Sequence, residues 1–572
     1  MARERKRREM QLSAVFDIET SEWDTFVAGA IYRDGSTEIF DYEHENDMIE
    51  ELMNIKGTVY AHFGGGFDFL WALDRARETI SSDIILRGSL ALQAKFGDSL
   101  LRDSYALAPM SLAKFSGGTK DTLGLECQCG QNCGGYCRIS RMMNPADHKR
   151  MIEYLSQDVK SLWDALEGWE GFCAQHNIDV GATIGASAWQ TVRRTAGLPP
   201  SELVSWSDTA AAIERHKWMR QAYFGGRTEV YQWSAAEAWE HDVHSMYPAM
   251  LAYEPMPLGA PRMEYGVYAA HSFEAGKQGI YTAIVNVPEM DYPPLPIRRR
   301  GRLYFPTGSF GGRWADTELK NAIACGAQVK IIDGLVYPES GIILRDFVEH
   351  IFELERVYPE WKHVTKYLRN SLTGKFGTGV DHKAVVMNPA RIENGMDDIN
   401  GRIFTMQKES LSACGHLEWA IFLTAAARVK QQKQLSIAGN DAIYGDTDSV
   451  YSARLLTENT GDGLGEYSKG KHVFGMEIIA PKVYSYRDSK GVEARAKGIS
   501  LKKGEIPEIG RQYPKKGGVK SLISAARAGE KLFVRSDGCR TLARRAGGRV
   551  DCGLRTRPPR ISEVPGEILT GE

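Results

Sequence analysis

YGDTDSV (residues 444–450) places two carboxylates, Asp446 and Asp448, two positions apart among turn-forming residues. The residues on both sides are apolar or β-branched, which predicts a strand, a tight turn and a second strand. Like charges at such a spacing repel each other, so a pair of this kind persists mainly where a cation or a shared proton holds it. An ordinary surface turn is the alternative, because Asp and Gly favour turns in any case.

A third carboxylate, Asp242, ends a predicted strand in AWEHDVHSMYPAM, just before a turn into a predicted helix. Only a large folded domain could bring it to the hairpin. Between them, WKHVTKYLRNSLTGKFGTG carries Lys362, Lys366 and Arg369 at helical spacings of three and four. A cationic helix that faces carboxylates suits triphosphate chemistry, in which the acids hold magnesium and the lysines neutralise the phosphates. A solvated helix face is the alternative.

Another group of acids lies in the N-terminal third of the chain. In SAVFDIET, Asp17 and Glu19 point to one face of a predicted strand. In VYAHFGGGFDFLWAL, Asp68 follows a glycine turn near the start of a helix, and in MIEYLSQDVKSLWDAL, Tyr154 and Asp158 share one helix face. Each could be a surface residue, but together they could converge on two hard cations that activate water against a phosphodiester.

Size and composition indicate a large globular enzyme. The 572 residues exceed one core, and at roughly 150 residues per domain they predict about three or four units. The hydrophobic content is 43% and the charged content 25%, as in soluble proteins. The chain has no apolar run of about 18 residues, and no apolar region follows the basic start MARERKRREM. We therefore expect no membrane span, no signal peptide and a cytoplasmic protein.

Charge is balanced overall but clustered locally. The net charge of −2 does not by itself indicate a nucleic-acid partner. Two basic clusters could track phosphates or could be solvated surface. They are RRRGR (298–302) and the C-terminal arginines Arg540, Arg544, Arg545, Arg549, Arg555, Arg557 and Arg560.

The nine cysteines indicate a reducing compartment, because their number is odd and no secretion signal accompanies them. Four of them, Cys127, Cys129, Cys133 and Cys137, lie in the glycine-rich CQCGQNCGGYC. This composition could wrap a structural tetrahedral zinc ion, although the spacing lacks a CxxC pair, so a zinc site and a metal-free loop both stay open.

The motifs, taken in chain order, resemble those of family B DNA polymerases, and more narrowly the protein-primed branch of phages, viruses and linear plasmids. FDIET, AHFGGGFD and YLSQD resemble the three exonuclease motifs, and DVHSMYP, KYLRNSLTGKFG and YGDTDS resemble polymerase motifs A, B and C. YFGG, TAAAR and KVY resemble the linker, primer-strand and primer-end motifs of the same family. The matches run in family order from residue 14 to about residue 484, which is far more specific than any single motif.

The resemblance implies a ribonuclease H-like α/β exonuclease domain and an α+β right-hand polymerase domain with palm, fingers and thumb. The implied units are the exonuclease (1–190), the linker and first part of the palm (191–260), an insertion like the terminal-protein docking region (261–345), the fingers (346–377), a second insertion like a strand-displacement hairpin (378–413), the second part of the palm (414–500) and the thumb (501–572).

The resemblance also assigns roles in nucleotide addition. Asp242 and Asp448 would ligate two Mg²⁺ or Mn²⁺ ions, with Val243 among the metal-binding positions and Asp446 in support. The implied nucleotide-binding residues are Ser245, Met246, Tyr247, Lys362, Lys366 and Asn370, with Tyr247 excluding the ribose 2′ hydroxyl. Motif B usually has Tyr where this chain has Thr373, which puts base and sugar selectivity in doubt.

For proofreading, the resemblance implies two further metal ions held by Asp17, Glu19, Asp68 and Asp158, with Tyr154 as an additional catalytic residue. The implied DNA-binding residues are Tyr223, Gly225, Gly226, Thr424, Arg428, Lys482, Tyr484, His62 and Phe63. The second exonuclease motif usually has Asn after its His, whereas Phe63 follows His62 here, so proofreading could be weaker or use another donor.

The function implied is DNA-directed DNA polymerisation with 3′–5′ exonuclease activity, primed by a protein and coupled to strand displacement. The implied partners are primer-template DNA, dNTPs, a terminal protein and a single-stranded-DNA-binding protein, and the chain would be a monomer. A nucleic-acid-primed or primer-independent polymerase is one alternative. A stand-alone nuclease and a catalytically inactive DNA-binding replication factor are others, but both leave intact carboxylates without a role.

Overall fold

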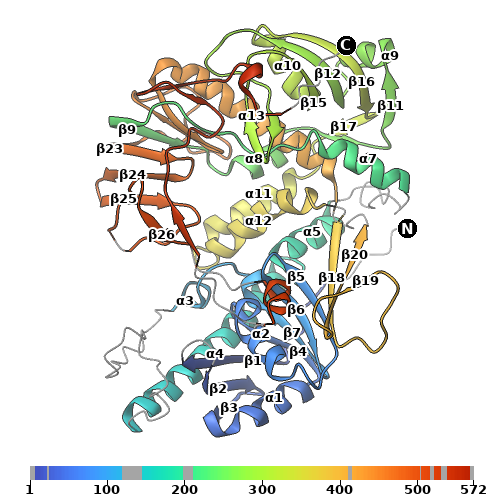
Figure 1. The fold of residues 1–572 in the computed structure, drawn as a ribbon, viewed down its shortest axis with the longest axis vertical. Helices are drawn as coiled ribbons and strands as arrows, with labels where there is room; N and C mark the ends of the chain where they lie inside the picture. Colours follow the sequence, from blue (N-terminus) through green and yellow to red (C-terminus); the bar gives the residue numbers. More distant parts are fainter. Residues whose placement is uncertain are drawn as a thin grey trace.

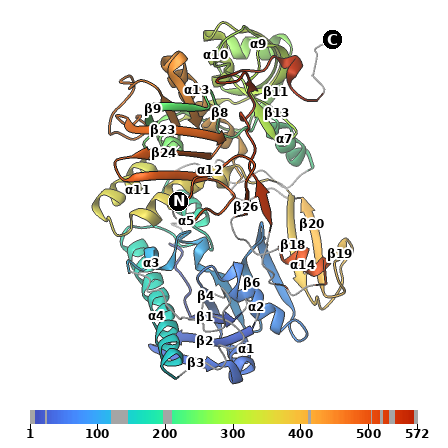
Figure 2. The same cartoon turned by 60° about the vertical axis from the view of Figure 1, so that its left-hand side comes forward.

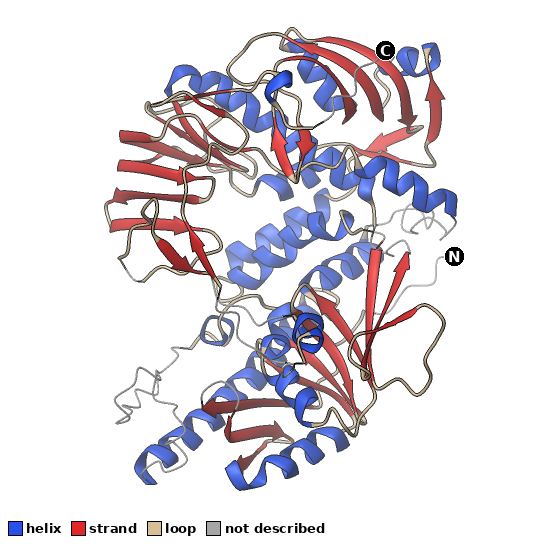
Figure 3. Cartoon of the chain, in the orientation of Figure 1, coloured by secondary structure: helices blue, strands red, loops and turns tan. Residues whose placement is uncertain are grey.

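Two large sheets stand on either side of a helical middle region (Figures 1 and 3). The computed structural model describes residues 7–21, 25–118, 145–196, 210–379, 381–409, 415–502, 504–515, 521–529, 532 and 538–566. No helix in these ranges is both long and apolar enough to cross a membrane.

The first sheet has ten strands in the order β19-β20-β18-β5-β6-β7-β4-β1-β2-β3. Strand β1 is parallel to β4 and antiparallel to β2, and its residues Ala14, Val15 and Phe16 are fully buried. Helix α4 packs on β1 and β2. The motif YLSQD on α4 is thereby brought to β1, the strand that carries FDIET. The N-terminal elements are β1 (Ala14–Ser21), β2 (Thr25–Arg33), β3 (Ser36–Asp41), α1 (Glu45–Asn54), β4 (Gly57–Ala61), α2 (Asp68–Arg75), β5 (Ser82–Arg87), β6 (Leu90–Phe96), β7 (Ser99–Asp103), α3 (Leu112–Phe115), α4 (Pro145–Gln175) and α5 (Ile184–Thr195).

The remaining three strands of this sheet come from a distant part of the chain. They are β18 (Asp381–Met387), β19 (Met396–Asp398) and β20 (Ile403–Glu409). Strand β18 pairs antiparallel with β5, with Val385 opposite Ile84. Val385 and Ile84 are both buried in the core that also contains Phe16. The predicted second insertion is therefore an extension of the N-terminal sheet (Figure 1).

The second sheet has seven strands in the order β25-β24-β23-β9-β22-β21-β8. The long helix α13, buried along most of its length, packs against β21, β22 and α8. This sheet carries the carboxylates of the 444–450 hairpin. Its elements are α7 (Ala210–Arg220), which precedes it, β8 (Thr228–Val230), β9 (Ser234–Asp242), α8 (Met246–Tyr253), α13 (Leu417–Ala438), β21 (Ala442–Asp446), β22 (Ser449–Ser452), β23 (Lys471–Ala480), β24 (Val483–Asp488) and β25 (Gly491–Ala496).

Residues 256–341 form a separate unit around a four-stranded sheet in the order β11-β16-β12-β15. Phe310, Trp314 and Leu319 belong to a buried cluster made mostly of residues from this unit, which Phe224 and Val564 complete. Its elements are β10 (Met256–Leu258), β11 (Arg262–Tyr265), α9 (Val267–Glu274), β12 (Gly279–Val287), β13 (Ile297–Arg299), β14 (Arg302–Tyr304), β15 (Gly308–Ala315), α10 (Asp316–Ala324), β16 (Gln328–Val336) and β17 (Glu339–Gly341).

The helical hairpin of α11 (Arg345–Val357) and α12 (Lys362–Phe376) lies between the two sheets (Figure 1). Its tip contacts the nuclease-like unit through aromatic rings. The Trp361 ring centre lies 5.5 Å from that of Trp169 and 5.4 Å from that of Phe172, both on α4. The helix that carries the third N-terminal motif is thus in direct contact with the hairpin that carries the lysines.

The C-terminal stretch, predicted as a thumb over 501–572, packs on all three neighbouring units. Leu522 of α14 (Leu522–Arg527) joins the core of the N-terminal sheet, as Figure 2 shows for the helix. Tyr513 packs with residues of β23 and β24, and Val564 joins the core of the 256–341 unit. Short apolar segments are too small to form a hydrophobic core of their own, so their side chains pack into the cores of neighbouring units. The strands here are β26 (Gln512–Pro514), β27 (Cys539–Thr541), β28 (Val550–Asp551) and β29 (Thr556–Arg557).

Candidate active sites

The 444–450 stretch forms the predicted hairpin, whose strands lie between β9 and the edge strand β8 of the seven-stranded sheet. Asp446 pairs with Ser449, so Thr447 and Asp448 form the turn. Ser449 also pairs with Asp242, the last residue of β9, and Val243 N–H donates to the Asp448 carbonyl over 2.9 Å. The ends of β21, β22 and β9 meet here, which brings Asp242 next to Asp448.

The neighbouring charges make this site acidic. Although solvent reaches Asp242, the surrounding protein and the charges of Asp448 and Glu240 raise its pKa to about 7. The pKa of Asp448 is also raised, mainly by burial and then by Asp446. The charge of Lys366 on α12 lowers the pKa of both Asp242 and Asp448, and that of Lys482 lowers the pKa of Asp448 as well. Such mutually repelling acids favour the binding of further cations.

Asp446 has a different environment from the other two acids. Its carboxylate forms an ion pair with the Lys482 ammonium group. The Tyr444 hydroxyl donates to Asp446 Oδ2 over 3.1 Å, and Tyr444 in turn accepts from the Lys482 N–H over 2.8 Å. The Thr228 hydroxyl lies 3.4 Å from Asp446 Oδ1. These partners tie Asp446 to β8 and to the turn before β24.

The linker motif YFGG passes close behind the turn, and this explains one of its glycines. A Cβ atom at Gly226 would lie 2.6 Å from Thr447 Cγ2 and 3.1 Å from the Tyr247 hydroxyl. Only glycine permits this approach. Gly225, by contrast, is exposed, and Tyr223 is half-buried against Gly377 at the end of α12.

The predicted direct contact of Thr424 and Arg428 with DNA differs from what the structure shows. Thr424 is buried, and its hydroxyl donates to the Ala420 carbonyl within α13. Arg428 is also buried and pairs with Glu318 of α10 over 2.9 Å. Arg428 Nη1 donates to the carbonyls of Phe224 (2.6 Å) and Gly225 (3.1 Å). Arg428 therefore positions the linker motif, and no surface remains on it for a DNA strand.

Helix α12 presents two of its three predicted cations toward solvent. Lys362 and Lys366 are exposed, and Asn370 is partly exposed one turn further along the same face. Arg369 lies on the opposite face, buried, where it binds Glu355 of α11 through two hydrogen bonds of 3.0 and 2.9 Å. Arg369 therefore joins the two helices and is not available to phosphates.

The other residues with an expected nucleotide or primer role are largely buried. Ser245 has a left-handed backbone, with φ of 60°, at the start of α8, and Met246 is buried behind it. The pKa of Tyr247 is raised to about 12, mainly by burial, with Asp448 among its acidic neighbours. Tyr484 is 8% exposed, and its hydroxyl lies 3.3 Å from that of Tyr451. For Tyr484, burial leaves little ring surface for a primer end.

Two of the N-terminal acids line a pocket of about 240 Å³. Asp17 of β1 and Asp158 of α4 line it together with His62 and Phe63. Tyr154 is near the same acids: burial first, then Asp158, Glu19 and Asp17, raises its pKa. The strand and the helix thus deliver their predicted residues to one place.

Asp68 and Asp103 form a buried pair of acids beside this pocket. Burial raises the pKa of Asp68 to about 7, and the charges of Asp103 and Glu19 add to the effect. Among the described residues, Asp68 Oδ1 has no hydrogen-bond partner. Asp103, at the end of β7, accepts from the N–H of Tyr105 over 2.9 Å and of Gly65 over 3.3 Å. The sequence prediction omitted Asp103, although a carboxylate that ends a strand in SLLRDSY is the signal that could have identified it.

His62 and Phe63 both line this pocket but differ in their surroundings. Both ring nitrogens of His62 face protein: Nδ1 lies 3.0 Å from Ser104 Oγ and Nε2 lies 2.7 Å from the Met110 carbonyl. Phe63 has a left-handed backbone with φ of 63° and is 40% exposed at the pocket. An exposed ring in this place can stack on a nucleobase, whereas His62 is a structural link.

The acids suit hard cations by their chemistry. Magnesium in phosphoryl-transfer sites is usually bound by one or two carboxylates, the remaining ligands being water and substrate phosphates. Asp242 with Asp448, and Asp68 with its unpartnered oxygen, offer such donors. In the described ranges, no three His, Cys, Asp or Glu side chains stand close enough to hold a metal ion by themselves. The zinc candidates Cys127, Cys129, Cys133 and Cys137 lie outside the described residues.

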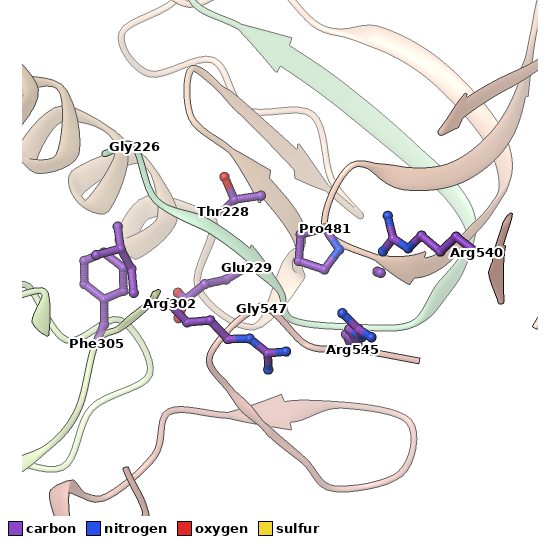
Figure 4. A pocket seen from close by; sticks show the side chains of 11 residues that line it. Gly226, Thr228, Glu229, Arg302, Phe305, Pro481, Arg540, Arg545 and Gly547 are labelled. Atoms are coloured by element: carbon purple, nitrogen blue, oxygen red, sulfur yellow. The ribbon is translucent and has the colours of Figure 1, made fainter. Parts of the chain in front are cut away.

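A basic pocket of about 310 Å³ lies next to the strand and linker that contact the Asp446–Asp448 turn (Figure 4). Gly226 and Pro481, the neighbour of Lys482, are in its wall, and the side chains of Arg302, Arg540 and Arg545 surround it. Within the described residues, none of these three arginines forms an ion pair. They come from the hairpin β13–β14 and from the C-terminal stretch, the two basic clusters of the sequence.

Comparison with known proteins gives the family. The family model described as "DNA polymerase type B, organellar and viral" matches residues 144–438, more than half of the chain. A "Probable DNA polymerase" of Neurospora intermedia is 26% identical over 310 residues, 48% of this chain and 32% of that protein. A "DNA-directed DNA polymerase" of Enterobacteria phage PRD1 is 28% identical over 261 residues, 43% of this chain and 40% of that protein. The chain thus spans less than half the length of these curated relatives.

A solved structure confirms the fold predicted from the sequence. Phi29 DNA polymerase, in complex with primer-template DNA and incoming nucleotide substrates, superimposes with a TM-score of 0.70 at 16% identity. The match covers 93% of this chain and all of that one, so it includes nuclease, palm, fingers and thumb regions alike. Because the family model spans more than half of the sequence and contains motifs A and B, the chain belongs to the organellar and viral type B DNA polymerases.

Proposed function

We propose that this chain is a DNA-directed DNA polymerase that adds dNTPs to a primer 3′ end and carries a 3′–5′ proofreading exonuclease. The observation that carries the proposal is the approach of Asp242 and Asp448 on adjacent strand ends, with the positive charge of Lys366 on α12 acting on both. Relatives named as DNA polymerases, and a neighbour solved with primer-template DNA, support the substrate class.

For nucleotide addition, Asp242 and Asp448 would hold two magnesium ions. When bound, these ions would lower the pKa of the primer 3′ hydroxyl and neutralise charge on the triphosphate and the departing pyrophosphate. Lys362 and Lys366, exposed on one face of α12, would bind the triphosphate oxygens. Asp446 would act in support, because Lys482 and Tyr444 already engage its oxygens.

For proofreading, Asp17, Glu19, Asp68 and Asp158 would hold magnesium around the pocket on β1 and α4. Phe63 would stack on the terminal base of a frayed primer, in place of the amide that the family usually has. Tyr154, whose pKa is raised by burial and by Asp158, would keep its proton and donate a hydrogen bond in that pocket.

Priming by a protein and strand displacement are further parts of the proposal. Residues 256–341 form a unit around its own four-stranded sheet, as a docking region for a terminal protein would. The strands β18–β20 stand as an extension of the nuclease sheet, where a strand-separating hairpin would act. A single-stranded-DNA-binding protein would assist, and the enzyme would work as a monomer in the cytoplasm of its host cell. The test is transfer of a labelled dNMP to a small protein encoded beside this chain, with loss of transfer in Asp448→Asn.

The decisive experiment compares wild type, Asp448→Asn and Asp17→Asn on a 5′-labelled primer annealed to a longer template, with magnesium, with and without dNTPs. Asn keeps the shape of each side chain and removes its charge. We expect Asp448→Asn to lose extension and keep primer shortening, and Asp17→Asn to show the reverse. Arg356→Gln, which changes an exposed pair on α11, is the matched control and should retain both activities.

Absence of extension by the wild type with magnesium and with manganese would contradict the polymerase assignment. Primer shortening alone would leave a nuclease. Loss of both activities in both single variants would show that the two carboxylate groups do not serve separate reactions.

A further inference from the structure

Glu229 of β8 and Arg227, which directly precedes that strand, lie behind the Asp446–Asp448 turn. Arg227 Nε donates to Glu229 Oε2 over 2.6 Å, and both side chains are buried. The Arg227 carbonyl accepts from the Thr447 N–H over 2.8 Å. Thr447 has a left-handed backbone with φ of 59°, which residues other than glycine hold only where the surroundings enforce it. The carbonyl of Arg227 is therefore a restraint on the turn that presents Asp446 and Asp448.

A loop of the 256–341 unit covers this ion pair. Arg227 Nη1 donates to the Pro293 carbonyl over 3.0 Å, and the guanidinium lies 4.1 Å from the centre of the Phe305 ring. Glu229 also accepts from the Tyr231 hydroxyl over 3.2 Å. A buried ion pair depends on all of its partners, because any charge left without one cannot recover its hydration.

The C-terminal stretch completes the cluster. Arg549, whose side chain is 2% exposed, lies 3.8 Å from Glu229 (Nη1 to Oε2) and donates to the Asp291 carbonyl over 3.0 Å. Arg549 Nε donates to the Thr556 hydroxyl over 2.8 Å. The Thr556 hydroxyl donates in turn to the Val230 carbonyl of β8 over 2.5 Å. Residues 549–556, which we call the C-terminal clasp, are thus bonded to the strand that carries Glu229.

The chain already runs close to β8 at Gly547, two residues before the clasp begins. Gly547 has φ of 84°, and a Cβ atom there would lie 2.6 Å from the Thr228 carbonyl oxygen and 3.4 Å from Glu229 Cα. Figure 4 shows Gly547 next to Glu229 at the edge of the basic pocket. A chain this close transmits a displacement of the clasp directly to the strand.

We propose that Arg549 and Thr556 of the C-terminal clasp are positioning residues of the polymerase site. Arg549 holds Glu229, and Thr556 holds the neighbouring Val230 of the same strand. Through Glu229 and Arg227 they restrain the Thr447 turn, so that Asp448 stands beside Asp242. The inference rests on the proposed polymerase function, but it assigns a role in that reaction to residues that touch no nucleotide. Among the described residues, Glu229 Oε1 and Arg227 Nη2 already lack a hydrogen-bond partner. If the Arg549 side chain were removed, little else could take its place as a charged partner of Glu229.

The test compares Arg549→Met, Arg549→Lys and Thr556→Val with wild type for kcat and KM of single-nucleotide addition. Exonuclease rate on a single strand, measured on the same preparations, reports folding of the rest of the chain. The matched control is Arg560→Met, because Arg560 lies on the same stretch and pairs with Glu289 over 3.1 Å at the surface, with both side chains largely exposed.

We expect Arg549→Met to lower kcat on the order of tenfold to a hundredfold, as small misplacements of reacting groups do, with the dNTP KM changed by less than about threefold. Thr556→Val should lower kcat in the same direction, Arg549→Lys should recover part of it, and Arg560→Met should match wild type. Exonuclease rates should be unchanged throughout.

An unchanged kcat in Arg549→Met, with an active wild type, would overturn the inference while leaving the polymerase assignment intact. A parallel loss of both activities with a lowered melting temperature, repeated in Thr556→Val, would show a purely structural role and would overturn it as well. A wild type that fails to extend the primer would contradict the proposed function before any variant is compared.

Discussion

Phe63 is a residue at which this chain departs from the nuclease motif of its family. The ring is exposed at the pocket that contains Asp17 and Asp158. Because stacking of a base on an aromatic ring contributes about 1–3 kcal/mol, Phe63→Ala should raise the exonuclease KM for a single strand about tenfold. Single-strand degradation kinetics measure this, with extension of a paired primer as the internal control. An unchanged KM would show that the ring does not touch the strand.

The raised pKa of Asp103 can be tested by measuring how the free energy of unfolding depends on pH. Burial raises its pKa to about 7 in the folded protein, from an ordinary value of 3.8. Between these values the folded chain binds more protons than the unfolded chain, so this group stabilises the fold at low pH. Its contribution falls by about 1.4 kcal/mol per pH unit as the pH rises toward 7.

Asp103→Asn keeps an acceptor for the N–H groups of Tyr105 and Gly65 and cannot ionise. We therefore expect its free energy of unfolding to depend less on pH than that of the wild type between pH 4 and 7. Denaturant unfolding at a series of pH values measures the difference between the two slopes. Equal slopes would mean that Asp103 is ionised throughout.

At the scale of residues, the sequence predicted the acids that share a local motif. Asp17 and Glu19 lie on one strand, and Asp446 and Asp448 on one hairpin, so periodicity alone associates them. Arg428 and Arg369 show the limit of this reasoning. Their motifs mark them as important, but whether such a side chain faces DNA or a buried glutamate depends on elements distant in sequence.

The fingers hairpin is held together by one buried ion pair. Arg369 of α12 and Glu355 of α11 form two hydrogen bonds with each other, and the pair is almost fully buried. Glu355→Gln would leave the guanidinium with an uncharged partner. Breaking a buried pair from one side costs about 3–5 kcal/mol, so we expect a clear fall in the free energy of unfolding and a higher dNTP KM.

The double variant Glu355→Met/Arg369→Met is the control for this pair, because it removes both charges and keeps the volume apolar. Its free energy of unfolding should lie closer to that of the wild type than the single variant does, since replacing both partners is often neutral. Denaturant unfolding and dNTP titration measure the two effects. A double variant less stable than the single one would contradict this explanation.

At the scale of elements, the local sequence was enough to predict the fingers helix but not the strand pairing of the second insertion. The helical spacing predicted a helix that Gly374 and Gly377 end, and α12 continues past Gly374 to Phe376, with Gly377 as its cap. The pairing of β18 with β5 was not predicted, because the partner strands are separated by most of the chain. A strand's own sequence does not specify a distant partner.

The two basic clusters come together only in the whole molecule. Arg302 and Arg545 lie at one pocket, next to the strand and linker that contact the Asp446–Asp448 turn, and neither has an ion-pair partner within the described residues. If both contact duplex phosphates, Arg302→Gln/Arg545→Gln should weaken primer-template binding. The slope of log K against log salt should become less steep by roughly one to two units.

Binding isotherms at a series of salt concentrations, with Arg356→Gln on the exposed surface of α11 as the control, measure this slope. An unchanged slope in the double variant would show that the pocket lies off the DNA path.

The order of the units along the chain could be read from the motifs. The route of residues 501–566 across three of those units could not, since each contact rests on one or two side chains, such as Leu522 and Val564.

The shared core of the ten-stranded sheet has a consequence for any attempt to transplant the nuclease. A fragment excised at residue 196 would lack Val385, Met387 and Leu522, which complete that core. It would also leave β5 as an open edge with an exposed Ile85, a template for association between copies. A portable editing module from this protein would have to carry the β18–β20 hairpin and helix α14 with it.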